Sequence, residues 1–390
     1  MNLIRESLTL NKNLSVIGFF LIVILFANPV IAVEVYQPSL GARAASMGQI
    51  YTSVVNDSTS LWYNPAGIAR HEAAAAEFSV NYSYNRIEDP ANEWQHLSNE
   101  INYVGGYSRL TDLRTEKQHR SWKYLQNLSI GMAYMTPYEI RYDSTSARNL
   151  LDDTPIGRVR VKYRQISLGS GYSMHKKLAI GFNADYLFTH VECLENAPCV
   201  SQGPAGYGIS AGLVAGPFDL AIFDFSMALA FRSPITLNYD AYFRDSLTQK
   251  FLDGMPGRPR VISFGTQSQF VILQQVATSV NFSVEEIHWV SPESDNVSFN
   301  NTVEPYRRAG MSFELTSLVV KKLGISLRGA VSRVISDSDI ISGAWQVSAG
   351  GGIQAFYHHF IDISLERRRI SSSDVSWSPW LVNLSYSFQY

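Results

Sequence analysis

The sequence has few charged residues, two cysteines and only one long apolar run. Charged residues make up 17% of the 390 residues, against about 25% in soluble domains. The 32 Lys and Arg are balanced by 34 Asp and Glu, which argues against a partner that is a nucleic acid. One apolar run excludes a bundle of membrane-spanning helices, because each helix needs about 20 apolar residues. A soluble β-rich protein and a transmembrane β-barrel remain.

Motifs for catalysis are also missing. The sequence contains no G-x-S-x-G, no P-loop and no H-E-x-x-H pattern, so the residue sets that build a nucleophile, a phosphate cradle or a zinc site are not present as motifs. We therefore expect a protein that is not an enzyme, with no cofactor and no metal site.

The apolar run lies at the N-terminus. Leu14 to Ala27 is apolar, Arg5 and Lys12 precede it, and Val30-Ile31-Ala32 offers a small residue at a cleavage site. This pattern predicts a secretory signal peptide over residues 1–32. The alternative is an uncleaved anchor helix, for which the run is short. We expect an exported chain that begins near Val33.

The two cysteines are Cys193 and Cys199, and the segment between them contains Asn-Ala-Pro. This tripeptide indicates a turn, so we predict a disulfide that closes a small local loop. The alternative, half of a metal site, lacks nearby histidines.

Apolar residues alternate with polar ones along most of the remaining chain. In residues 276–285, for example, Val280 and Phe282 alternate with Ser279, Asn281 and Ser283. This period of two predicts strands. Fourteen candidate strands are found, at 75–86, 99–109, 127–140, 158–174, 177–192, 205–217, 219–239, 260–271, 274–290, 305–315, 323–334, 344–356, 358–369 and 380–390.

The second face of these strands decides between the two β classes. It carries Ser, Asn, Gln and Gly, where a soluble sandwich would carry Lys and Glu. A membrane barrel turns its apolar residues to lipid and its small polar residues to the lumen. The sequence therefore predicts an all-β fold, a 14-stranded antiparallel transmembrane β-barrel over residues 75–390; a secreted β-sandwich is the alternative.

Links between the strands alternate in length. Long links follow odd-numbered strands, and tight links such as His175-Lys176, Pro217-Phe218 and Tyr357-His358 follow even-numbered ones. Short turns of such barrels are periplasmic and long loops are extracellular. Both chain ends are therefore expected in the periplasm.

Residues 33–74 do not alternate and are rich in Gly, Ala and Ser. Here the chain resembles the long-chain fatty-acid transport family of bacterial outer-membrane proteins, the FadL/TodX group. The strongest match is Leu61-Trp62-Tyr63-Asn64-Pro65-Ala66-Gly67, and a second is Phe231-Arg232-Ser233-Pro234-Ile235. The resemblance implies that residues 33–74 form an N-terminal hatch inside the lumen. The residues that carry the hatch motif are Gly41, Arg43, Gly48, Asp57, Asn64, Pro65, Ala66 and Gly67.

The resemblance also implies a function. It implies a monomer in outer-membrane lipids that captures hydrophobic small molecules, such as long-chain fatty acids, among its loops. These molecules then reach a lumenal pocket at the hatch and leave sideways through a kinked strand. The third strand, with Gly131 and Pro137, corresponds to this lateral gate. We expect Asn64 and Pro65 to hold the hatch exit against the first strand.

Two arginines face the lumen in the predicted strands and are candidates for binding a ligand carboxylate. These are Arg328 and Arg368, because a carboxylate pairs well with a guanidinium group. Salt bridges in the lumen that stabilise the plug are the other interpretation of both residues.

Other partners and functions are also open. The aromatic residues Tyr386, Phe388 and Tyr390 at the C-terminus resemble the signal that the barrel-insertion machinery reads. A related branch, the PorV-type barrels of the type IX secretion system, docks proteins, and a structural or adhesive barrel is a third possibility.

Overall fold

The computed structural model describes most of the barrel wall and part of the N-terminal region. The described residues are 35–36, 39–70, 76–86, 98–110, 127–143, 158–193, 203–237, 257–273, 275–289, 305–320, 323–336, 345–356, 358–371, 376–377 and 380–389. The predicted signal peptide, Cys199 and Tyr390 lie outside these residues, as does the side chain of Cys193. The signal peptide and the disulfide therefore stay predictions.

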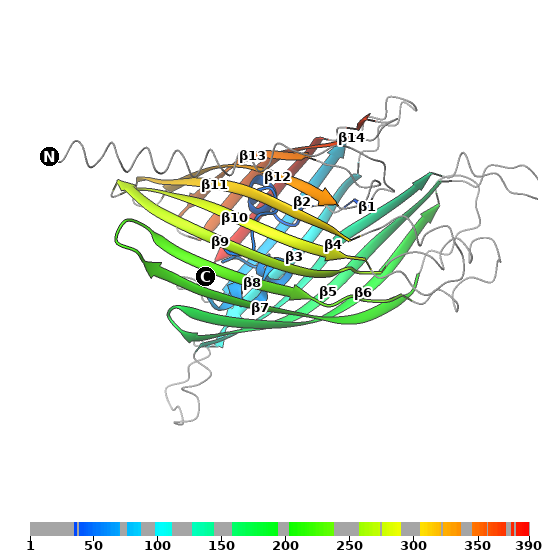
Figure 1. Cartoon of the computed structure of the whole chain (residues 1–390), viewed down its shortest axis with the longest axis horizontal. Helices are drawn as coiled ribbons and strands as arrows, with labels where there is room; N and C mark the ends of the chain where they lie inside the picture. Colours follow the sequence, from blue (N-terminus) through cyan, green and yellow to red (C-terminus); the bar gives the residue numbers. More distant parts are fainter. Residues whose placement is uncertain are drawn as a thin grey trace, which may run out of the picture.

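Fourteen antiparallel strands form one closed sheet (Figure 1). Each strand pairs with its neighbours in the sequence, and β16 pairs with β2 to close the barrel. The strands of the wall are β2 (Ala76–Arg86), β3 (Ser98–Arg109), β4 (Leu128–Asp143), β5 (Arg158–His175), β6 (Leu178–Cys193), β7 (Ala205–Asp219), β8 (Asp224–Arg232), β9 (Arg260–Leu273), β10 (Val276–His288), β11 (Tyr306–Val320), β12 (Leu323–Ser336), β13 (Trp345–Ala355), β14 (His359–Ser371) and β16 (Trp380–Gln389). The predicted fold class, strand number and strand order are confirmed.

The wall is apolar on the outside and polar on the inside. On β10, Val280 is 41% exposed while its neighbour Asn281 is fully buried. The same alternation recurs around the wall, with exposed residues that include Ile130, Met132, Leu168, Phe182, Ile209, Phe264, Phe313, Leu327, Ile363 and Leu384. This is the reverse of a soluble protein and matches the predicted lipid face and polar lumen.

Short helices occupy the interior. They are α2 (Ala42–Ser46), α3 (Ser60–Tyr63) and the 3₁₀ helix η1 (Pro65–Ala69), drawn in blue inside the barrel in Figure 1. We call residues 39–70 the inner segment, and nearly all of them are buried. Among the described helices, none reaches the length and apolar character required to span a membrane.

The β7–β8 turn differs from the prediction. The turn was expected at Pro217-Phe218, but β7 continues to Asp219 and β8 begins at Asp224. A register shift between Ala215 and Phe218 lets β7 pass Pro217 within the sheet. Proline removes one ladder donor, and a bulge accommodates that loss.

β8 is also shorter than predicted. It ends at Arg232, and Ile235 forms an isolated bridge with Arg258. Both residues are buried. The chain therefore turns inward after Arg232, where the predicted strand continued to residue 239.

The β3–β4 pairing is incomplete. Tyr103 to Arg109 pair with Ser129 to Met135, after which β3 and β4 separate. The β4–β5 register shifts at the same place. Met135 pairs with Gln165 and Tyr138 pairs with Tyr163. Two residues of β4, Thr136 and Pro137, therefore face a single residue of β5, Arg164. Further along, β4 pairs instead with β1 (Val35–Tyr36) through Ile140 and Glu139. We call the stretch around Thr136 and Pro137 the wall break.

The outward polarity makes a prediction for Leu168, which is 57% exposed on β5. Replacing it with arginine in lipid vesicles should lower the free energy of unfolding by up to about 2–4 kcal/mol, because a charge on the lipid face is poorly solvated. Leu168→Phe is the control and should change stability by about 0.5 kcal/mol or less. Urea unfolding in vesicles measures both. Equal stability of the two variants would mean that this face meets water.

Candidate functional site: the barrel interior

The motif around Asn64 fixes the shape of the inner segment. The Asn64 Oδ1 accepts a hydrogen bond from the Ala66 N–H at 3.1 Å. Its Nδ2 donates to the carbonyl oxygens of Thr52, at 3.1 Å, and Leu213, at 3.3 Å. Pro65 begins η1, as expected for a residue whose φ is already helical. One buried amide thus caps a helix and joins two distant chain segments.

Glycines of the wall allow η1 to approach it closely. A Cβ at Gly181 would lie 2.2 Å from the Pro65 carbonyl carbon, and one at Gly212 would lie 1.9 Å from the Asn64 Oδ1. Both distances are far below normal contact, so no larger residue fits either position. η1 packs on β5, β6 and β7. The expectation that the Asn64-Pro65 motif lies against the first strand was therefore wrong.

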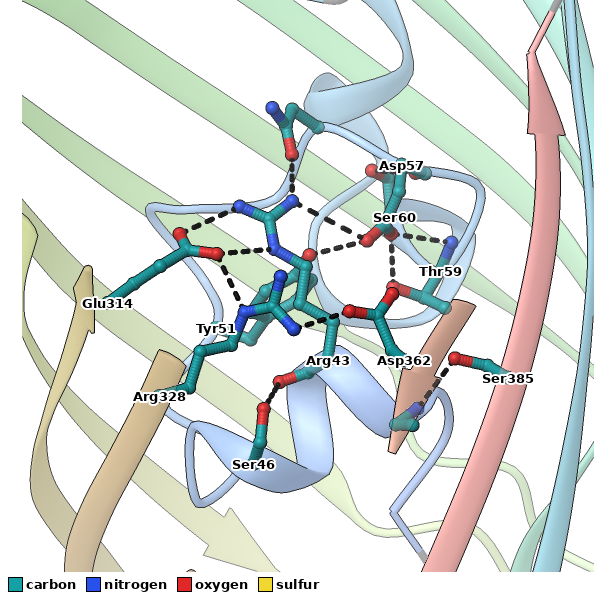
Figure 2. Close-up of polar contacts among 12 residues, drawn as sticks. Arg43, Ser46, Tyr51, Asp57, Thr59, Ser60, Glu314, Arg328, Asp362 and Ser385 are labelled. Atoms are coloured by element: carbon teal, nitrogen blue, oxygen red, sulfur yellow. Dashed lines mark hydrogen bonds and ion pairs between the residues drawn. The ribbon is translucent and has the colours of Figure 1, made fainter. Parts of the chain in front are cut away.

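Arg43 joins α2 to the wall strand β11. Its Nη2 lies 3.0 Å from the Glu314 Oε2, its Nε donates to the Glu314 Oε1 at 3.3 Å, and its Nη1 lies 3.9 Å from the Asp57 Oδ2. Figure 2 shows its guanidinium group between these two carboxylates. An ion pair with so little exposure is costly to break, because the charges that remain are poorly hydrated.

Asp57 and the flanking glycines shape the turns around Arg43. The Asp57 Oδ1 accepts from the Thr59 N–H at 3.0 Å, and its Oδ2 accepts from the Tyr51 hydroxyl. Burial raises the pKa of Tyr51, so its hydroxyl stays protonated and donates. Gly41 and Gly48 have φ of 92° and 61°, a region that favours glycine.

The two arginines that were predicted to bind a ligand carboxylate already pair with carboxylates of the barrel wall. The Arg328 Nε donates to the Glu314 Oε1 at 2.7 Å, and its Nη1 pairs with Asp362 (Figure 2). The Arg368 Nε donates to the Glu366 Oε1 at 2.6 Å. Both arginines therefore form the lumenal salt bridges that were the other interpretation of the sequence, and their role toward a ligand stays untested.

A polar cavity of about 600 Å³ borders the Arg43 network. It extends toward the ends of β9, β10 and β11 that the short links join. Its lining includes Arg43, Asp57, Gln267, Gln269, Thr278, Ser279, Glu314, Thr316, Ser326, Arg328, Gln354, Asp362 and Gln389. The lining also includes the apolar residues Val54, Ile353 and Phe360. The charged groups of the Arg43 network nevertheless favour water and polar solutes on that side of the cavity.

Buried aromatic rings lie elsewhere in the interior. The Tyr138 ring makes edge contacts with Trp62, Tyr163 and Trp289, at centroid distances of 5.6, 6.3 and 5.5 Å. We call these four residues the aromatic cluster. Aliphatic side chains in the same core include Leu187, Ile235, Leu237, Val261 and Ile287. The sequence analysis did not single out Tyr138, Tyr163 or Trp289, since the cluster forms only where the paired strands β4 and β5 meet Trp62 of the inner segment and Trp289, the residue after β10.

The aromatic cluster lies at the wall break. Tyr138 directly follows Thr136 and Pro137 on β4. Gly131, the other residue predicted for the lateral gate, pairs regularly with Tyr107 and Gly169. A Cβ there would lie 3.2 Å from the Leu61 Cδ1, so Gly131 makes room for the inner segment.

Arg232 also belongs to this region. Its guanidinium carbon lies 4.0 Å from the centroid of the Trp62 ring, a cation–π geometry. Arg232 is part of the second sequence match, but its proximity to Trp62 depends on the placement of the inner segment and could not be predicted.

No protein-family model matches the chain, and no curated protein matches it in sequence. Solved structures do match. CymD, a monoaromatic hydrocarbon channel, aligns with a TM-score of 0.58 and 12% identity over 90% of this chain and 98% of CymD. The chain shares the fold of these barrels.

Two further structures give the same result. The toluene transporter TodX of Pseudomonas putida aligns with a TM-score of 0.54 and 13% identity, over 93% of this chain and 99% of TodX. A FadL homologue of Pseudomonas aeruginosa aligns with a TM-score of 0.55 and 10% identity, over 90% of this chain and 98% of the homologue.

The close approach at Gly181 makes a second prediction. Gly181→Ala should lower the free energy of unfolding by about 1–3 kcal/mol, as overpacking does, because the methyl group meets the Pro65 backbone. It should also make the inner segment more accessible to protease. Gly324→Ala is the control, because the nearest atom to its new methyl group, the Gln354 Oε1 at 3.3 Å, lies at the end of a flexible side chain. Equal protease resistance of both variants would contradict the interlock.

Proposed function

We propose that this protein is a bacterial outer-membrane barrel that transports hydrophobic small molecules. The observation that carries the proposal is the position of the aromatic cluster beside the wall break. In the proposed route, a molecule bound near Tyr138 leaves between β3 and β4 into the bilayer. The inner segment acts as the hatch that closes the lumen.

The surface polarity supports a location in the outer membrane. Apolar residues are exposed on the outer face all around the described wall. The closed ladder leaves few backbone groups without a hydrogen-bond partner, as a lipid environment requires. CymD and TodX, which have the same fold, are described as a hydrocarbon channel and a toluene transporter. We propose that the protein acts there as a monomer, after delivery to the barrel-insertion machinery.

The physical chemistry of the cargo supports a lateral exit. Each buried CH₂ group of a ligand contributes about 0.8 kcal/mol to its preference for an apolar environment over water. An axial exit would pass the polar cavity beside Arg43. A lateral exit at Pro137 leads directly from aromatic side chains to lipid.

Removing the extra residue at the wall break tests this route. Deleting Pro137 would let Thr136 face Arg164 and restore a regular β4–β5 ladder, since two residues now face one. Because a bulge bends its strand, its removal should also straighten β4 and let it continue beside β3 past Met135, where their pairing now ends. Uptake of labelled toluene by intact cells that carry the deletion variant in place of the unmodified protein should fall to the level of cells that lack the protein. Pro137→Ala keeps the number of residues and is the matched control, with uptake close to that of the unmodified protein.

Two results would contradict the proposal. Unchanged uptake by the deletion variant would exclude the wall break as the exit. A protein that binds no hydrophobic molecule but captures a secreted protein from periplasmic extract would favour the docking function.

A further inference from the structure

Arg232 is a buried cation with an unused donor. Its side chain belongs to a residue that is only 4% exposed, and its Nη1 has no hydrogen-bond acceptor among the described residues. One face of the guanidinium group is covered by Trp62 at 4.0 Å. A buried charged donor without an acceptor carries a large free-energy cost.

A second buried arginine, Arg258, allows a comparison, because its guanidinium group has hydrogen-bond acceptors within the protein. Arg258 is fully buried. Its Nη1 donates to Asp185 at 2.6 Å and to Gln165 at 3.1 Å, and its Nε donates to the Ser233 carbonyl oxygen at 3.0 Å. Its Nη2 donates to the Ile209 carbonyl oxygen at 3.1 Å. Arg258 therefore has internal acceptors that Arg232 lacks.

Arg232 shares the counter-charge of Glu285 with another arginine. Glu285 attracts Arg232 through space, but its carboxylate pairs with Arg308 and also accepts from the Ser263 hydroxyl. Two guanidinium groups thus share the Glu285 carboxylate, and among the described residues no second carboxylate is paired with Arg232. An anion placed at the Arg232 Nη1 would supply a counter-charge.

We propose that Arg232 and the aromatic cluster form a binding site for a small aromatic carboxylate. The carboxylate accepts a charge-assisted hydrogen bond from the Arg232 Nη1. The aryl ring packs edge to face among Trp62, Tyr138 and Trp289, the arrangement these rings already use with one another. This assignment rests on the proposed function and adds to its cargo small molecules that carry both an aryl ring and a carboxylate.

Benzoate and toluene make a matched pair of probes, since they differ only in a carboxylate or a methyl group on the same ring. Titration calorimetry on the full-length barrel in lipid nanodiscs measures both affinities, with octanoate as an alkyl carboxylate for comparison. We expect the unmodified protein to bind benzoate at least tenfold more tightly than toluene or octanoate. Arg232→Met should lower the ratio of benzoate to toluene affinity at least tenfold, and Arg232→Lys should restore part of that ratio.

Arg258→Met separates recognition from stability. Without ligand, it should lower the unfolding temperature, because Asp185 loses its ion pair. Arg232→Met should leave the ligand-free unfolding temperature unchanged or higher, because it removes an unsatisfied buried donor. A similar loss of stability in both variants would give Arg232 a structural role and overturn the assignment.

The binding results have distinct meanings. If toluene binds but benzoate does not, or if Arg232→Met keeps the benzoate to toluene ratio, the Arg232 site is wrong and the proposed transport function stands. If octanoate binds as tightly as benzoate, the aromatic specificity is wrong. If none of the three probes binds, the proposed function fails together with this site.

Discussion

Closure of the hydrogen-bonded ladder is the constraint on which the rest of the structure depends. In lipid, an unpaired backbone group has no water to bind, so each strand needs a partner on both sides. The wall departs from this between β3 and β4, and the N-terminal region compensates. β1 pairs with β4 beyond the wall break, and the Asn102 Nδ2 on β3 donates to the Ser39 carbonyl oxygen at 3.1 Å. The irregular part of the wall and the inner segment therefore stabilise each other.

The inner segment is attached to the wall in two different ways. Around Asn64 and Pro65 the contact is mainly steric, because Gly181 admits the Pro65 backbone, Gly212 admits the Asn64 side chain, and neither position leaves room for a Cβ. Around Arg43 the contact is electrostatic and borders the polar cavity. Steric interlocking is insensitive to salt, whereas partly hydrated ion pairs are screened by it. Raised salt should therefore weaken the contact at the Arg43 end more than the contact at Asn64 and Pro65.

The alternation of side chains predicts most of the wall, because period two reports the two faces of a strand directly, as Val280 and Asn281 illustrate. It fails where the partner of a residue is remote. Nothing local to residues 233–237 indicates that this segment bonds to Arg258, which in turn pairs with the buried Asp185. Similarly, the sequence placed Arg328 on the lumenal face but could not show that Glu314 and Asp362 neutralise it. Arg232 was not proposed as a site residue, because a sequence cannot show that its Nη1 has no hydrogen-bond acceptor among the described residues.

The interior is more polar along the barrel axis than toward the wall break. A hydrophobic molecule inside the barrel would therefore move more easily toward the wall break than along the axis. Movement along the barrel axis meets Arg43, Glu314, Arg328 and Asp362, which are linked in one network. Separating any of these pairs leaves a poorly hydrated charge, which costs several kcal/mol, and a hydrophobic molecule offers no hydrogen bond in return. Movement toward Pro137 displaces only contacts among aromatic rings, worth about 0.5–1.5 kcal/mol each, which the rings of an aromatic cargo replace. In the proposed route, the ion pairs around Arg43 would thus also favour movement of an apolar cargo toward the wall break.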